Sequence, residues 1–313
     1  MTRIVSRSDA LARGFSDAEL QRYCRTKAWR RLRPGKFVSR SEFDTLSATE
    51  KHRVIAEAVY SSATADDTVV SHVSAAVFHG LDVEASDLRR VHLTRNRIGG
   101  SRKSKLRIVH AAAYSPSEVT LVDGVRVTTL ARTIADIGRS LTFENAVCLA
   151  DLAARRKKLT RDQVLAVLDA CPTHPDNRKA RRVANFMDGR AESGGESLCR
   201  IVLHELGYAP RLQVGLADAD GEFARVDFYL DDIFTVVEFD GRIKYGRLVP
   251  EGQTPSDVAW KEKRREDRIR SGGAQVVRLT YDDLQHPERI ARSIRAAADR
   301  ARKSPPPTLT IGR

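Results

Sequence analysis

Two short apolar segments that carry carboxylates limit most strongly how this chain can fold. Residues 226–230 and 236–241 have the length and the β-branched content of strands. Because side chains i and i+2 of a strand share one face, Glu238 and Asp240 should project together. If Asp227 ends the neighbouring strand, three carboxylates converge. Such a cluster predicts a site for a hard cation, Mg²⁺ or Mn²⁺, of the kind that activates a water against a phosphodiester.

The flanking segments predict the elements that would hold this site. Residues 196–207 should form a helix, because apolar side chains recur at four-residue spacing and Gly207 is a stop signal. Residues 260–270 predict a second helix, and residues 274–280 a further strand rich in valine. The expected order is helix, strands, helix, strand.

With this order the region resembles the PD-(D/E)XK nuclease superfamily, and within it the Vsr-like endonuclease domains, over about residues 191–313. The resemblance implies a restriction-endonuclease-like α/β domain at 191–303. It also implies a Mg²⁺ or Mn²⁺ ion held by Asp227, Glu238 and Asp240. The residues that carry the resemblance, and the implied catalytic set, are Glu196, Asp227, Glu238, Asp240 and Lys244, with the charged run 262–267 behind them.

One position departs from the superfamily pattern. The usual (D/E)-x-K element would place a lysine where this chain has Asp240. Either a lysine has moved, with Lys244 the nearest candidate and Lys261 or Lys263 behind it, or the site has lost its chemistry. Glu238 can also be interpreted as a structural residue, because a carboxylate in an otherwise buried segment needs a partner that offsets the cost of burying its charge.

Charge separates the chain into two parts. The formal net charge is +13, yet residues 191–313 hold 20 basic and 20 acidic side chains. Residues 1–190 therefore carry the whole excess, which predicts a polyanionic partner for the N-terminal part. The first forty residues hold eleven Lys or Arg and only three acids.

The same forty residues predict a winged helix-turn-helix. Residues 6–12 suggest a short helix, 13–15 a turn, and 16–19 a capping box that opens a second helix reaching Lys27. Residues 29–38 have the alternation of a β-hairpin. The second helix would enter the major groove of double-stranded DNA with the hairpin as its wing. The predicted DNA-binding residues are Gln21, Arg22, Arg25, Lys27, Arg31, Arg33 and Lys36. The alternative is a basic surface helix without a groove partner.

The segment that follows resembles the AbiEi-type antitoxin and transcriptional-regulator family, through residues 70–81, 91–94 and 123–136. The resemblance covers about residues 1–170 and implies a winged helix followed by a mixed α/β domain at 45–170. It also implies promoter binding or capture of a toxin protein. Residues 171–190 are expected to be a linker, and residues 304–313 a disordered tail.

Isolated polar residues of the middle region are interpreted as structural. His72, His79 and His92 lack the spacing of metal ligands. Arg132 and Asp136 lie four apart on a predicted helix, as in a structural ion pair. The cysteines Cys24, Cys148, Cys171 and Cys199 form no CxxC pair, which indicates reduced thiols rather than a zinc ribbon.

The sequence thus predicts an α+β protein, DNA-binding and cytoplasmic, since no run approaches the roughly 18 apolar residues of a membrane span. Its expected function is that of a metal-dependent DNA endonuclease, in phage defence or mobile-element biology. The alternative is a non-enzymatic AbiEi-like antitoxin or repressor with a degenerate nuclease-like domain. A toxin protein and a second copy of the chain are further candidate partners.

Overall fold

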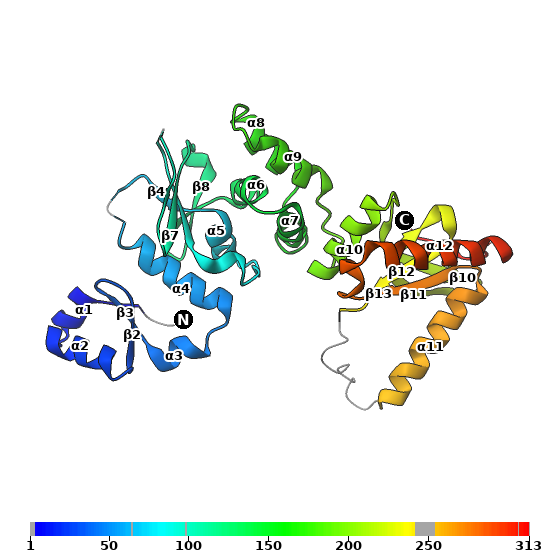
Figure 1. Cartoon of the computed structure of the whole chain (residues 1–313), viewed down its shortest axis with the longest axis horizontal. Helices are drawn as coiled ribbons and strands as arrows, with labels where there is room; N and C mark the ends of the chain where they lie inside the picture. Colours follow the sequence, from blue (N-terminus) through cyan, green and yellow to red (C-terminus); the bar gives the residue numbers. More distant parts are fainter. Residues whose placement is uncertain (1–3, 64, 98, 242–253, 306, 313) are drawn as a thin grey trace. The chain divides into compact units, whose positions relative to one another are not determined.

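The computed structural model describes residues 4–63, 65–97, 99–241, 254–305 and 307–312. The fold is α+β, as the sequence predicts, with one three-stranded, one five-stranded and one six-stranded sheet. The chain divides into two compact units (Figure 1). The first comprises residues 1–153 and 158–187, and the second comprises residues 154–157 and 188–313.

The N-terminal forty residues have the predicted order of helix, turn, helix and hairpin. The elements are β1 (Val5–Ser6), α1 (Arg7–Ala12), α2 (Asp17–Arg25), β2 (Trp29–Arg33) and β3 (Lys36–Ser39). Ser16 and Glu19 form the predicted capping box at the start of α2. Strand β1 was not predicted, and it pairs with β3. Leu20 and Phe37 pack with Ala10, so the two helices and the hairpin share a small core.

This small core belongs to the same unit as the six-stranded sheet. The chain continues through α3 (Arg40–Thr45), α4 (Ala48–Tyr60), β4 (Thr68–Val70), α5 (His72–Phe78), β5 (Val91–Arg95), β6 (Arg102–Lys103), β7 (Arg107–Ala111), β8 (Val119–Val122) and β9 (Val125–Thr128). The strand order is β6-β7-β5-β4-β9-β8. Helix α4 contacts β2 on one side and β4 and β5 on the other, and so joins the hairpin to the larger sheet (Figure 1).

Four helices follow the sheet: α6 (Leu130–Ser140), α7 (Phe143–Lys157), α8 (Arg161–Asp169) and α9 (Asn177–Phe186). Helix α9 corrects the prediction of a linker at 171–190. It packs closely on α6, where a Cβ on Gly138 would lie 2.9 Å from the Cα of Ala180. Buried Asn177 also accepts hydrogen bonds from Arg139 of α6. The composition of α9 hides this packing, because only one stripe of small apolar residues faces inward.

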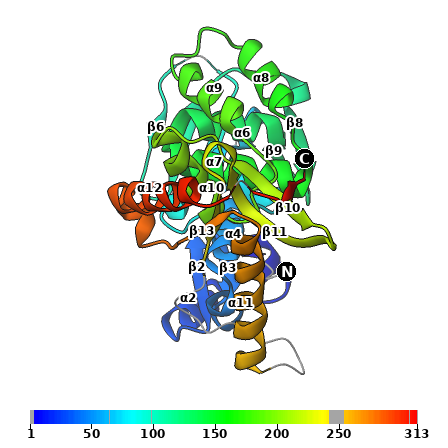
Figure 2. The same ribbon diagram turned by 90° about the vertical axis from the view of Figure 1, so that its right-hand side faces the viewer.

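The second unit is a five-stranded sheet with helices on both faces (Figure 2). Its elements are α10 (Gly194–Glu205), β10 (Arg211–Asp218), β11 (Gly221–Leu230), β12 (Thr235–Phe239), α11 (Pro255–Ser271), β13 (Gln275–Leu279), α12 (Pro287–Lys303) and β14 (Thr310–Ile311). The strand order is β13-β12-β11-β10-β14, and β12 and β13 form the parallel pair.

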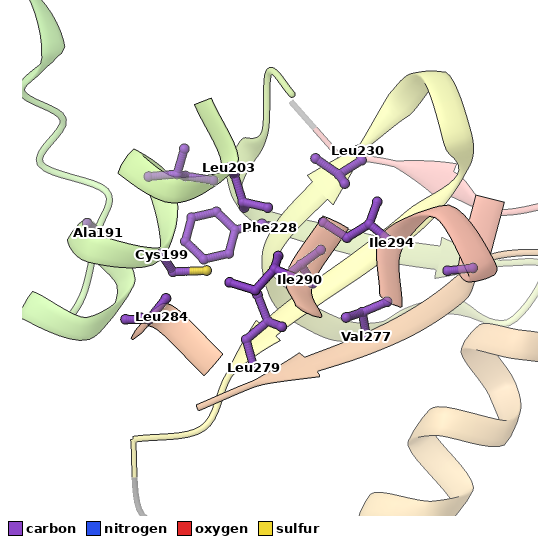
Figure 3. Packing of buried hydrophobic residues seen from close by; sticks show 13 residues of the cluster. Ala191, Cys199, Leu203, Phe228, Leu230, Val277, Leu279, Leu284, Ile290 and Ile294 are labelled. Atoms are coloured by element: carbon purple, nitrogen blue, oxygen red, sulfur yellow. The ribbon is translucent and has the colours of Figure 1, made fainter. Parts of the chain in front are cut away.

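One face of this sheet packs on α10 and α12. Figure 3 shows Phe228 of β11 between side chains of these helices, among them Leu203 and Ile290. Ile269 of α11 lies in the separate core of the opposite face. Strand β14 corrects the prediction of a disordered tail, because Ile311 pairs with Leu216 of β10. The sheet thus fixes the backbone of β10, β11 and β12, on which the candidate carboxylates lie.

Candidate functional site

The exposed face of α2 gathers the polar residues that the sequence assigned to DNA. Leu20 is buried in the small core, so the face turned away from it carries Gln21, Arg22 and Arg25. At about 100° per residue these three fall within one sector of the helix surface. Arg22 lies 3.8 Å from Glu19, a loose exposed pair that leaves its guanidinium available.

The turn and the hairpin continue this basic surface. Lys27 and Arg31 are exposed, and Lys36 is half-buried. Within the described part of the chain, no acid lies within ion-pair distance of Arg25, Lys27 or Arg31. Arg33 behaves differently from the other hairpin residues. Its guanidinium donates to the carbonyl of Val59 in α4 and therefore fastens the hairpin to α4 rather than facing solvent.

A second basic region lies on the six-stranded sheet of the same unit. A hollow of about 350 Å³ is lined by five cationic side chains from β5 to β7 and their loops: Arg95, Arg97, Arg102, Lys103 and Arg107. Burial lowers the pKa of Arg33, and the positive charge of Arg107, one of the residues lining this hollow, lowers it further. No sequence pattern singles out these residues, because they are spread over three short segments.

In the second unit the structure brings together Glu196 and Asp227, with Gln213 between them. The Gln213 amide donates to Glu196 Oε2 at 3.0 Å and to Asp227 Oδ1 at 3.4 Å. The second oxygen of Asp227 accepts the backbone N–H of Phe239 at 2.9 Å. Three elements, α10, β10 and β11, therefore present two carboxylates around one amide. Gln213 gave no sequence signal, since a polar residue between apolar ones is ordinary in a strand.

The local backbone explains why Asp227 lies here. Val214 and Val226 pack on the α11 face of the sheet, whereas Leu212 and Phe228 pack on the α10 face. The apolar side chains thus change faces across Gln213 and Asp227, and Gln213 has a φ of 52°. This irregularity frees Asp227 from the simple alternation that strand periodicity predicts.

Glu196 is fixed by the first turn of α10. Ser193 caps the helix and donates through Oγ to Glu196 Oε1 at 2.9 Å, while the backbone N–H of Glu192 donates to Oε2 at 2.8 Å. The helix start lies very close to β12, because a Cβ on Gly195 would overlap with Cε1 of the Phe239 ring. A glycine is therefore required next to the catalytic candidate.

Glu238 pairs with arginine instead of joining Glu196 and Asp227. Glu238 forms an ion pair with Arg265 of α11, and Arg278 lies 3.8 Å from its other oxygen. The backbone N–H of Asp240 donates to the carbonyl of Leu279. Glu238 thus has the partner that a carboxylate in a buried strand needs. Lys244, the proposed substitute for the missing lysine, lies outside the described residues.

Burial is the main influence on the charge of both strand carboxylates. It raises the pKa of Asp227, which the nearby charge of Glu196 raises further, against the hydrogen bond from Phe239. Burial also raises the pKa of Glu238, and Arg265 opposes this rise. The surroundings of Asp227 therefore oppose its ionised form, which a bound cation would stabilise, whereas Arg265 already stabilises the ionised form of Glu238.

These contacts decide how well the residues suit a hard cation. Glu196 and Asp227 suit it, because both offer carboxylate oxygens and, among the residues that the structure describes, neither forms an ion pair with a basic side chain. Glu238 does not suit it while it pairs with Arg265. In the described part of the chain, Asp227, Glu238 and Asp240 do not bring their ligand atoms within 4.8 Å of one another.

Comparison with known proteins gives relatives but no activity. No protein-family model matches the chain. Two uncharacterized proteins of Mycobacterium tuberculosis, from strain CDC 1551 / Oshkosh and strain ATCC 25618 / H37Rv, are each 28% identical to it over 183 residues. The match covers 58% of this chain and 65% of each relative, less than two thirds of their length. Among the described residues, none of the helices has the length and apolar character needed to cross a membrane.

Proposed function

We propose that the chain binds double-stranded DNA through α2 and the hairpin β2–β3. The observation that carries this proposal is the exposed face of α2, where Gln21, Arg22 and Arg25 lie together above a core that fixes the helix. Arg31 extends the positive charge onto the hairpin. This combination is the one by which a recognition helix enters the major groove while a wing contacts phosphates.

The dimensions and the charge support the same proposal. An α-helix with its side chains is about 10–12 Å in diameter, which fits a major groove about 12 Å wide, and α2 is nine residues, or about 13.5 Å, long. The basic hollow around Arg102 and Arg107 belongs to the same unit and would extend the contact along the phosphate backbone. Arg33, which is fastened to Val59, is not part of the proposed contact.

Binding to a labelled duplex, followed by fluorescence anisotropy, tests the proposal. The double variant Arg22→Ala/Arg25→Ala should bind at least tenfold more weakly, because it removes two cationic side chains that would reach phosphates or bases. The matched control is Arg292→Ala/Arg295→Ala, which removes two exposed arginines at the same spacing from α12. Equal weakening in both double variants would show that only net charge matters and would reject the α2 interface.

The second proposed activity is metal-dependent cleavage of that DNA by the C-terminal unit. The pair of Glu196 and Asp227 around Gln213 supports it, since these two carboxylates would hold Mg²⁺ or Mn²⁺. When bound, the ion would position a water and stabilise negative charge on the phosphate. Gln213 would hold the two carboxylates in place. Glu238 could join them only after leaving Arg265, and Asp240 and Lys244 remain proposed members of the site.

Plasmid nicking in Mg²⁺ or Mn²⁺ tests this activity. Glu196→Gln and Asp227→Asn should each abolish nicking without weakening duplex binding, because the two sites lie in different units. The control is Asp232→Asn, which changes an exposed acid of the same unit. Nicking that survives in Asp227→Asn would reject the proposed site.

A non-enzymatic repressor or antitoxin is the alternative, and the ion pair between Glu238 and Arg265 favours it. In that case the protein binds DNA, or a toxin protein, and cleaves nothing. Duplex binding without nicking in any divalent metal would support this alternative. A cytoplasmic location, a second copy of the chain as partner, and a role in phage defence or mobile-element biology are proposed from the family resemblance only.

A further inference from the structure

Three histidines from distant parts of the sequence meet in the first unit. His72 is the first residue of α5, His92 lies on β5 and His110 lies on β7. One ring nitrogen of each lies within 4.8 Å of the others. Among the described residues this is the one group of three or more His, Cys, Asp or Glu side chains that is gathered so closely.

The strand register explains how two of the three meet. Strands β5 and β7 are parallel, and His92 pairs with Ile108 while Thr94 pairs with His110. His92 and His110 therefore lie on the same face, two positions apart on neighbouring strands. The Nε2 atom of His110 is 3.1 Å from the Nδ1 atom of His92.

The start of α5 brings the third ring. The backbone N–H of Ser71 donates to the carbonyl of His92 and so ties the helix start to β5. His72 has a φ of 53°, a left-handed conformation that is uncommon for a residue with a side chain. Its ring stacks on that of His110, with 3.8 Å between the ring centroids. This conformation is one that a fold retains mainly where the side chain has a role.

We propose that His72, His92 and His110 form a binding site for one divalent transition-metal ion of the Zn²⁺ class. Imidazole nitrogens suit this class of ion, and three histidines with an open fourth position are a common ligand set. Two nitrogens bound tetrahedrally at about 2.05 Å lie about 3.3 Å apart. The separation of 3.1 Å between His92 and His110 is close to that value.

The surroundings fit the ligands that the ion requires. Nδ1 of His72 lies 2.9 Å from Oγ of Ser71, so a proton on Nδ1 leaves the lone pair of Nε2 for the ion. Burial lowers the pKa of all three histidines, that of His92 to about 3, so the rings are neutral near pH 7. His92 and His110 are only partly buried, and solvent reaches them.

Nearby charges do not exclude a dication. Arg132 and Arg139 are buried close to His72, but both pair with Asp136, and Arg132 pairs also with Glu118. These two arginines and two acids cancel in net charge. The positive charges of Arg90 and Lys103 also act on His92, but both side chains are exposed, where solvent screens their charge. The negative charge of Asp136 also lies near His110, where it partly opposes the effect of burial on the pKa of that ring.

Titration of Zn²⁺ by calorimetry, and of Co²⁺ by its visible absorption, tests the site in the full chain without a polyhistidine tag. We expect one ion per chain, and a loss of affinity of at least 100-fold in His110→Ala. The matched control is His204→Ala, which removes an exposed histidine of the other unit and should bind normally. Absence of binding in the wild type, or undiminished binding in His110→Ala, would overturn the proposal.

Two further variants keep the test decisive. If His110→Ala does not fold, His92→Gln replaces it, and circular dichroism of the apo protein establishes that the variant is folded. Zn²⁺ should raise the melting temperature of the wild type but not that of the histidine variant. Asp227→Asn should bind Zn²⁺ normally, so the outcome is independent of the proposed nuclease site. Zn²⁺ binding abolished in Asp227→Asn and kept in His92→Gln would place the ion elsewhere and refute the site.

Discussion

Gly195→Ala should destabilise the second unit, although alanine is the better helix former. The new Cβ would overlap with Cε1 of the Phe239 ring and lie 2.7 Å and 2.8 Å from two further ring carbons. The ring cannot simply turn away, because its edge packs on Tyr281 with the two centroids 4.9 Å apart. Overpacking of this kind costs about 1–3 kcal/mol, against a gain of at most about 1 kcal/mol from helix propensity.

A double-mutant cycle separates the two effects. In a Phe239→Ala background the obstacle to the new Cβ is absent, so Gly195→Ala should be neutral or stabilising by up to about 1 kcal/mol. Because helix propensity contributes equally in both backgrounds, the coupling free energy between the two positions should equal the overpacking cost of about 1–3 kcal/mol, beyond the error of such cycles.

Hydrogen exchange in increasing urea, measured by mass spectrometry on peptides from α10 and β12, gives the free energy of unfolding of this unit alone. Equal effects of Gly195→Ala with and without the Phe239 ring would refute the close approach of α10 to β12. They would also remove the reason for placing Glu196 beside β12.

Three further changes test the charged groups. Asp227→Asn should stabilise the unit at pH 7 by up to about 2 kcal/mol. Because the pKa of Asp227 is raised, its favourable contribution to stability is present at acid pH and is lost as pH rises through that pKa. The stability gained by Asp227→Asn should therefore vanish below about pH 4. A gain that does not depend on pH in urea unfolding would contradict this reasoning. Arg265→Ala should cost about 1–3 kcal/mol in urea unfolding, because Glu238 loses its nearest partner, and Arg265→Lys should cost less. Asp136→Ala should cost about 3–5 kcal/mol, since it leaves buried Arg139 without an acidic partner and leaves Arg132 with Glu118 alone. A change below about 1 kcal/mol would show that the network adds little.

The sequence predicted well those elements whose signals are local. The capping box of Ser16 and Glu19, the apolar spacing of α10 and the valines of β13 identified their segments within a few residues. The ion pair of Arg132 and Asp136 is confirmed at 3.0 Å. Helix α11 begins at Pro255, five residues before the predicted start. A capping box of Thr254 and Asp257 was the overlooked signal.

The candidate site was harder to predict, because it depends on packing between distant segments. The sequence indicated Glu196 and Asp227, but not that Gln213 joins them or that Glu238 pairs with Arg265 from α11. Strand alternation alone suggested that Asp227 and Glu238 converge. In the structure the apolar side chains of β10 and β11 switch from one face of the sheet to the other at Gln213 and Asp227, and Asp227 lies beside Glu196 instead.

The histidine cluster was missed for a similar reason. Because their spacing along the chain is not that of metal ligands, His72 and His92 were interpreted as structural residues. The parallel pairing of β5 with β7, which brings His110 to them, involves residues far apart in sequence.

The dependence of duplex affinity on salt tests the central claim, DNA binding through α2, most directly. The logarithm of the binding constant of the wild type should fall linearly with the logarithm of the salt concentration, because bound arginines release counterions. For Arg22→Ala/Arg25→Ala we predict a slope shallower by about 1–2, at about 0.9 for each phosphate that is no longer neutralised. An unchanged slope in that variant would contradict the account, since α2 would then not touch the DNA backbone.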